Sequence, residues 1–231
     1  MKKALLFLLS VAWAQLAFSQ ADSLIFANAY ESKNGNDINA AIFNGREHIG
    51  YPPLTEGIPY YGSKDWQPGH VVFEDALYNE VFLKYDLVAD QVIVRHPNKV
   101  TGIILFTPRV QSFSLGNRQF VNLPGKESEL KAGIYEELVT GKVALYVKRS
   151  KLIEESIVMN ELVRKVADKN SFYVFKDAHY YPVKKQKSIM ELIADKRNLV
   201  SSSMKASKIK FKSNPELAMT KIVELYNQLS H

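Results

Sequence analysis

Apolar residues recur at every second position through the middle of the chain, from about residue 42 to residue 183. Gly, Pro, Asn and Asp break this alternation at short intervals, as at Asn44-Gly45 and Gly116-Asn117. A period of two indicates β-strands, because successive side chains of a strand point to opposite faces. Connections this short join antiparallel neighbours and leave no room for crossover helices. The predicted meander has strands at 70–73, 78–85, 91–95, 102–106, 113–115, 119–123, 134–138, 141–148, 172–176 and 179–183.

The predicted strand at 78–85 is apolar on both faces. Val81, Leu83 and Tyr85 share one face, and alternation places Tyr78 and Phe82 on the other. Strands of this kind are covered twice, by helices, by a second layer or by a lipid-like ligand. Helices are the simplest cover, since the C-terminal part of the same chain supplies them.

Residues 151–169 fit two patterns, and the sequence leaves both open. Some apolar positions follow helical spacing, whereas Ile157, Met159 and Val163 follow the alternation of a strand. We favour strand or irregular structure at the start of this segment and keep a helix as the alternative.

The C-terminal part changes to a helical period. Ser188-Ile189-Met190-Glu191 has the form of a capping box, which predicts a helix start at Ser188. Asn214-Pro215 predicts a second start, with Asn as the cap and Pro where no N–H is needed. Between them we expect a further helix with Leu199, Val200 and Met204 facing inward. The last helix carries an apolar stripe made of Ala218, Met219, Ile222, Leu225, Tyr226 and Leu229.

These patterns predict an α+β protein. An antiparallel meander, with a curved half-barrel as one form of it, occupies residues 20–187. Two or three helices at 188–231 pack on this sheet, because a short amphipathic helix must bury its apolar stripe.

The first nineteen residues have the layout of a cleavable secretory signal. A basic start, Met1-Lys2-Lys3, precedes an unbroken apolar run at 4–14, which is short for a membrane span. Small residues then predict cleavage between Ser19 and Gln20. The chain has no cysteine, so it lacks the thiol of a lipoprotein anchor, disulfides and thiolate chemistry. We expect an exported protein, periplasmic or secreted, with no transmembrane helix after cleavage.

Charge divides the chain into two unequal parts. Residues 20–139 hold ten Lys or Arg and fifteen Asp or Glu, whereas residues 140–231 hold eighteen and nine. The basic part is compatible with anionic lipid headgroups, with the acidic part of the same chain, or with a solvated lysine-rich surface. Export makes nucleic acid an unexpected partner.

The sequence contains few candidate catalytic or metal-binding residues. The chain has no nucleophile elbow, zinc-protease motif, phosphate loop or dinucleotide fingerprint, and we expect no cofactor. His48 beside Glu47 is a candidate acid–base pair, with a charged surface strand as the alternative. Asp86 and Asp90 are candidate ligands of a calcium-like ion at the end of the sheet, with turn formation as the alternative.

Aromatic residues supply the candidate ligand site. Tyr60, Tyr61 and Trp66 lie in a Gly/Pro-rich loop, where rings stack on sugars or line the mouth of a ligand site. Phe82, on the second apolar face of its strand, is added to this set. The alternative is that the loop rings plug the open end of the sheet.

Three segments carry a resemblance to a known group of proteins. They are Tyr85-Asp86-Leu87 with Gln91-Val92-Ile93-Val94, the stretch from Tyr135 to Arg149, and Glu224-Leu225-Tyr226-Asn227-Gln228-Leu229. Together they resemble signal-bearing proteins of unknown function that are abundant in Bacteroidetes. The resemblance implies an envelope or secreted location and transfers no catalytic residues. That group more usually has Gly near residue 178, where this chain has Asp177-Ala178.

The leading hypothesis is an exported, non-enzymatic binding or envelope-associated module. Its partner is an apolar small ligand, anionic lipid headgroups or another envelope protein. One alternative is a periplasmic hydrolase whose acid–base residues meet only in the folded chain. Another is a structural subunit that joins an assembly through a sheet edge.

Overall fold

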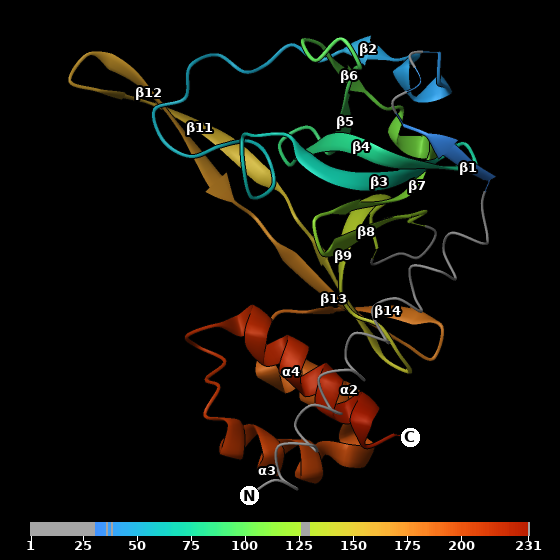
Figure 1. The fold of residues 1–231 in the computed structure, drawn as a ribbon. Helices are drawn as coiled ribbons and strands as arrows, with labels where there is room; N and C mark the ends of the chain where they lie inside the picture. The colour runs from blue at the N-terminus through green and yellow to red at the C-terminus, as the bar shows by residue number, and fades with distance from the viewer. Residues whose placement is uncertain (1–30, 36, 38, 126–129, 231) are drawn as a thin grey trace, which may run out of the picture.

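The computed structural model describes residues 31–35, 37, 39–125 and 130–230. A large, mostly antiparallel sheet is followed by three C-terminal helices, which confirms the predicted α+β class (Figure 1). Within the described residues the sheet is open, with β14 and β2 as its two edge strands. The predicted cleavage site, Ser19 and Gln20, lies outside the described residues.

Twelve strands form the sheet in the order β14-β13-β10-β9-β8-β7-β3-β4-β5-β6-β2, with β1 paired to β4. Their bounds are β1 Glu31–Asn34, β2 Arg46–Glu47, β3 Gln67–Phe73, β4 Ala76–Asp86, β5 Gln91–Arg95, β6 Gly102–Ile104, β7 Val110–Leu115, β8 Arg118–Leu123, β9 Gly133–Val139, β10 Ala144–Lys148, β13 Ser171–Lys176 and β14 His179–Val183. Every predicted strand overlaps one of these, and nearly all pairs are antiparallel. The exception is β1, which pairs in parallel with β4 at a place where the sequence indicates only a polar lead-in.

A β-bulge corrects the predicted faces of β4. Gly69 pairs with Val81 and Val71 pairs with Tyr78, so Asn79 and Glu80 together oppose one residue of β3. Glu80 has a φ of 57°, which accommodates the extra residue. Tyr78 and Val81 therefore both enter the core, and the prediction that they lie on opposite faces is wrong. Phe82 remains on the outer face, 42% exposed.

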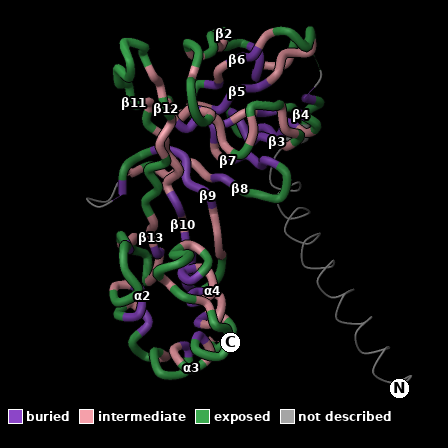
Figure 2. Tube along the Cα trace, turned by 90° about the vertical axis from the view of Figure 1, so that its left-hand side faces the viewer, coloured by how far each residue is buried: buried purple, intermediate pink, exposed green. Residues whose placement is uncertain are grey.

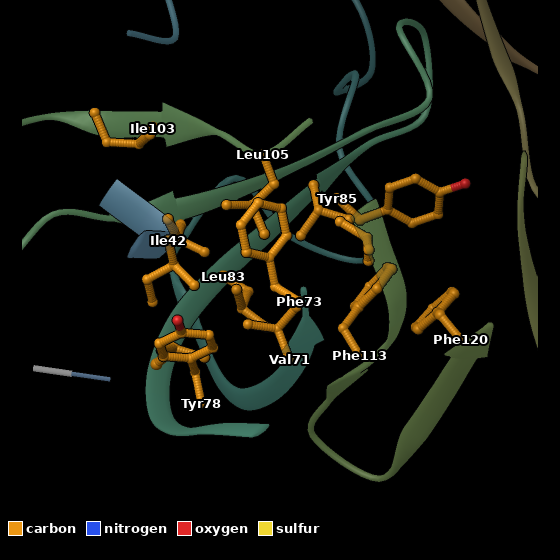
Figure 3. Packing of buried hydrophobic residues seen from close by; sticks show 14 of the residues in the cluster. Ile42, Val71, Phe73, Tyr78, Leu83, Tyr85, Ile103, Leu105, Phe113 and Phe120 are labelled. Atoms are coloured by element: carbon orange, nitrogen blue, oxygen red, sulfur yellow. The ribbon is translucent and has the colours of Figure 1, made fainter. Parts of the chain in front are cut away.

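Two separate apolar cores hold the fold together. The central core lies between strands β3 to β9 and the 3-10 turn η1 (Ala41–Phe43), and its aromatic rings interlock (Figure 3). Phe113 and Phe120 stack with ring centroids 4.7 Å apart, and Tyr85 contacts both rings edge-on. The central core consists of Ile42, Phe43, Val71, Phe73, Ala76, Tyr78, Val81, Leu83, Tyr85, Leu87, Val92, Val94, Ile103, Leu105, Val110, Phe113, Leu115, Phe120 and Ile134.

The helical core lies at the β10–β13–β14 end of the sheet. Strand residues such as Leu145 and Val174 pack there against α2 (Gln186–Leu192), α3 (Arg197–Ser207) and α4 (Pro215–Gln228), with a short turn η3 (Ala194–Lys196) between α2 and α3. The helices thus pack on one end of the sheet, below the central core in Figure 1. The apolar residues of the central strands pack against other strands of the same sheet.

The helix starts agree with the sequence in one case and differ in the other. Asn214 caps α4, since its Oδ1 accepts the backbone N–H of Leu217 at 3.0 Å. Ser188 is the third residue of α2 instead of its cap, and its hydroxyl donates to the Lys185 carbonyl oxygen at 2.7 Å. Val200 and Met204 face the helical core as predicted, but Leu199 is 58% exposed, so its inward orientation is wrong.

A buried ionic network joins the two cores. Glu136 on β9 is completely buried and accepts Arg149 Nε at 2.6 Å, Arg118 Nη1 at 3.2 Å and Tyr61 Oη at 3.1 Å. Arg149 also binds Glu216, in the first turn of α4, through two bonds of 2.6 and 2.8 Å. The network therefore fixes the position of the last helix relative to the central strands.

Residues 151–168 form a separate β-hairpin, which resolves the open alternative in favour of strands. β11 (Lys151–Val158) pairs with β12 (Glu161–Asp168) around a two-residue turn, Met159-Asn160, in which both φ angles are positive. This hairpin is a two-stranded sheet of its own and projects from the body of the protein (Figure 1).

Candidate functional site

The loop that carries Tyr60, Tyr61 and Trp66 packs against the sheet. Tyr61 packs edge-on against Phe120, with ring centroids 5.0 Å apart, and joins the buried network through its hydroxyl. Tyr60 bonds His48 Nε2 through its hydroxyl at 2.8 Å. The Lys84 ammonium lies 4.4 Å from the Trp66 ring centroid and 5.1 Å from that of Tyr60. These contacts favour the alternative in which the loop covers the sheet.

Phe82 presents an exposed ring on the outer face of β4. The Arg95 guanidinium lies over this ring, 5.9 Å from the ring centroid. A half-exposed ring beside one cation is an ordinary surface arrangement, so Phe82 gains no support as a ligand residue.

Asp86 and Asp90 both accept bonds from the protein itself. Asp86 is 1% exposed; one of its oxygens accepts the N–H groups of Val88 and Ala89, and the other accepts the Tyr51 hydroxyl at 2.8 Å. Such bonds are typical of a carboxylate that stabilises a turn.

Asp90 lies in a different environment. It accepts the Tyr85 hydroxyl at 2.6 Å and the Lys148 ammonium at 2.5 Å. An ammonium in this place repels a cation. Among the described residues no three His, Asp or Glu side chains come together to hold a metal. The geometry therefore gives the predicted shared metal site no support.

The candidate acid–base residues are only partly brought together. Burial lowers the pKa of His48, while the charge of Asp86 opposes that shift, so these two side chains share one polar cluster. Burial raises the pKa of Tyr60, which bonds His48. Glu47 is exposed on β2 and pairs through its backbone with Ile103, and Asp90 belongs to the Lys148 cluster. His48 bonds the Tyr60 hydroxyl, and Asp86 bonds the Tyr51 hydroxyl and two backbone N–H groups. These bonds hold the loop and the turn in place.

The basic C-terminal part contributes β10, β13, β14 and the three helices of the helical core, as well as the hairpin at residues 151–168. Most of its lysines are exposed, and one of its cations, Arg149, meets the acidic part of the chain at Glu136. Binding of this basic surface to anionic headgroups stays a prediction.

The hairpin carries the most unusual surface of the molecule. Its residues Leu152, Ile157, Val158, Met159 and Leu162 are five of the twelve large apolar side chains that the described residues expose. Ile157 is 77% exposed and Met159 at the turn is 94% exposed. The exposed stretch at the tip of the hairpin is visible in Figure 2. Contiguous apolar exposure of this kind marks interaction sites.

Hydrogen bonds from Lys151 attach the base of the hairpin to the body of the protein. The Lys151 N–H donates to the Leu87 carbonyl at 2.9 Å, and its ammonium donates to the carbonyls of Ile58 and Tyr60 at 2.8 and 3.1 Å. These bonds fix the direction in which the two strands leave the body.

The two edges of the hairpin differ. A loop strand covers β12, because Thr55 N–H donates to the Arg164 carbonyl at 2.8 Å and Val166 N–H donates to the Glu56 carbonyl at 3.0 Å. Gly57 makes this close approach possible, because a β-carbon added at this position would lie only 2.9 Å from the Val166 β-carbon. Its φ of 83° also favours glycine. On the outer edge of β11, no described backbone group bonds residues 152–158. An open strand edge with apolar side chains is a template for another strand.

Charges divide the exposed edge into three parts. Apolar residues stand at both ends of β11, and Glu154 and Glu155 stand in the middle. Glu155 binds Arg164 Nε at 2.7 Å, and Lys165, the cross-strand neighbour of Glu154, binds Glu56 instead. Glu154 has no ion-pair partner within the part of the chain that the structure describes.

The sequence did not predict this surface, because its pattern left undecided whether residues 151–169 form a helix or a strand. The signal that marks it is the apolar run Ile157-Val158-Met159 immediately before Asn160, since a hairpin turn is normally polar.

Fold and surface together define an α+β protein: an antiparallel meander, C-terminal helices at one end and a projecting apolar hairpin. Comparison with protein-family models, with curated proteins and with solved structures yields no match to this chain. No helix among the described residues combines the length and the apolar character needed to cross a membrane.

Proposed function

We propose that this chain is an exported, non-enzymatic binding module of the cell envelope that docks a partner protein on the open edge of β11. The main support is the hairpin: its base is fixed by backbone bonds, yet its apolar side chains are exposed and no described backbone group bonds the outer edge of β11 at residues 152–158. In this mode the added strand supplies backbone bonds, and alternate side chains supply specificity.

The chemistry of the edge favours a protein strand over a lipid surface. The hairpin holds three basic residues and four acidic ones, and Glu161 lies beside the apolar tip. Anionic headgroups attract basic surfaces, and burying a carboxylate among acyl chains is costly. Both effects oppose insertion of this tip into an anionic membrane.

The same charges argue against a second copy of this chain as the partner. A symmetric antiparallel pair of β11 strands keeps each face of the hairpin continuous, so a register centred on the strand brings either Glu154 opposite Glu154 or Glu155 opposite Glu155 of the other copy. Like charges directly opposite each other destabilise a strand pair. The complementary partner is an extended strand with apolar residues at both ends and Lys or Arg between them.

Photo-crosslinking in intact cells tests this docking. A photoreactive residue at Ile157 should give one discrete adduct, and the same residue at Val100, which is 87% exposed in another turn, should give none. The Glu154→Lys variant should abolish the adduct, because it reverses the charge in the middle of the edge. Glu161→Lys, on the covered strand, is the matched control and should retain it.

Two results would overturn the proposal. One is equal crosslinking at Ile157 and Val100, and the other is an adduct that survives Glu154→Lys. Flotation of the purified mature chain with vesicles of anionic phospholipid separates a lipid partner from a protein, since only the former carries the chain upward.

Export is tested separately. The mature protein recovered from the periplasm or medium should begin at Gln20, as read from the mass of its N-terminal peptide. A full-length chain that keeps residues 1–19 and stays in the cytoplasm would contradict the exported location.

A further inference from the structure

A cleft at the β2–β6 end of the sheet has no place in the hairpin proposal. Its volume is about 470 Å³, within the range of sites for small molecules. It opens between η1 with β2 on one side and β6 with the 3-10 turn η2 (Thr107–Arg109) on the other. None of its lining residues belongs to the hairpin.

The walls of the cleft are partly polar and partly apolar, and the apolar part is continuous with the central core. Ile42, Phe73 and Leu105 line it and belong to the central core, where each is at most 6% exposed. Phe106 lines it as well but is 61% exposed, so part of this side chain is open to contact. A rigid apolar floor with an exposed ring at the rim suits the flat or extended apolar body of a ligand.

The charged groups of the cleft are mostly cationic. Arg109 forms an ion pair with Glu74, and its guanidinium lies 5.7 Å from the Phe106 ring centroid. Arg46 projects from β2, and no carboxylate of the described residues pairs with it. A guanidinium beside an apolar wall offers two parallel N–H donors to a carboxylate or similar anion.

We propose that this cleft binds a small anionic amphiphile, with the anionic group on Arg46 and the apolar body against Phe106 and Ile104. Glu74 neutralises Arg109, so Arg46 supplies the net positive charge of the cleft. The cleft gives the protein a second binding activity that does not depend on the hairpin.

Fluorescence titration of the mature chain with anilinonaphthalene sulfonate, an aromatic anion, tests the site. The dye should bind saturably, and octanoate should displace it. Octanol and octylammonium share the same apolar chain but lack the anion, and they should displace it far less. Displacement by 2-naphthoate in place of octanoate assigns the site to aromatic rather than aliphatic anions.

Two variants locate the binding. Arg46→Gln should weaken dye and octanoate binding roughly tenfold, the loss expected for one hydrogen bond to a charged group. Phe106→Ala should weaken both as well. The matched controls Arg197→Gln on α3 and Phe82→Ala on β4 make the same chemical changes at exposed positions outside the cleft and should leave binding unchanged.

Ile157→Ser separates this proposal from the function of the hairpin. Dye binding that survives Ile157→Ser and falls in Arg46→Gln supports the cleft. Dye binding that falls in Ile157→Ser and not in Arg46→Gln, or equal displacement by octanoate and octylammonium, overturns it. Far-ultraviolet circular dichroism and thermal unfolding show that each variant is folded.

Discussion

Arg149 and Glu216 form a two-pronged ion pair between the end of β10 and the first turn of α4, with N–O distances of 2.6 and 2.8 Å. The same guanidinium neutralises Glu136, which is completely buried. Replacing Arg149 with Met should destabilise the protein by about 3–5 kcal/mol, because it leaves a buried carboxylate without its main partner. Urea unfolding measures this loss.

Two further variants show that burial is the cause. Glu216→Gln keeps Glu136 paired and should cost about 1 kcal/mol, the scale of one ordinary hydrogen bond. Arg164→Met breaks an exposed pair with Glu155, in which the carboxylate is 56% exposed, and should cost less than about 1 kcal/mol. Equal losses in all three variants would contradict the argument.

Asp90 stabilises the protein as an ion-pair partner of Lys148. Burial lowers the pKa of Lys148 and Asp90 opposes that shift, so the charged ammonium depends on this carboxylate. Asp90→Asn should destabilise the protein by about 2 kcal/mol, whereas Asp168→Asn, at a 72% exposed position, should change stability by less than about 0.5 kcal/mol. Calcium should not shift the unfolding temperature, and a rise that Asp90→Asn removes would restore the metal hypothesis.

Two half-buried histidines should make stability fall in weak acid. Burial lowers the pKa of His48 and of His70 below the usual 6.5. Below that pH the unfolded chain binds more protons than the folded one, so unfolding becomes easier. The urea midpoint should therefore decrease from about pH 7.5 to about pH 5.5.

Replacement identifies the residues responsible for that pH dependence. His70→Gln should flatten the profile, while replacement of His179, exposed beside the β13–β14 turn, serves as the control. A wild-type midpoint that rises toward pH 5.5 would contradict the sign.

The β13–β14 turn stores strain that glycine would relieve. Asp177 and Ala178 both adopt positive φ angles, 50° and 63°, as a two-residue hairpin turn requires. Alanine is disfavoured there by its β-carbon, so Ala178→Gly should stabilise the protein by about 0.5–1 kcal/mol despite the added freedom of the unfolded chain. The unfolding temperature should rise, and Ala206→Gly, within α3, should lower it.

Local patterns predicted strands such as those of the β3–β4, β7–β8 and β13–β14 pairs because a two-residue turn closes each of these pairs. Alternation failed on β4, where the single extra residue at Glu80 moves Tyr78 onto the core face. It also missed the parallel pairing of β1 with β4, since nothing near Glu31 indicates a partner more than forty residues away. The Asn214 cap was predictable because its bond is local.

The sites were harder to predict, because they depend on exposure and on distant contacts. Tyr61 meets Glu136 across 75 residues, and that bond turns a candidate ligand residue into a structural one. The hairpin was ambiguous because Leu152, Ile153 and Ile157 suit a helix as well as a strand. The cleft brings Arg46 of β2 beside Phe106 and Arg109 at the two ends of η2, and it left no motif in the sequence.

The hairpin shares no residue with either core. Mutations along its exposed edge should therefore cost little folding stability. Recognition can diversify through a handful of positions while the rest of the molecule stays under the constraints of close packing. Related chains that keep this scaffold should differ most between residues 152 and 162.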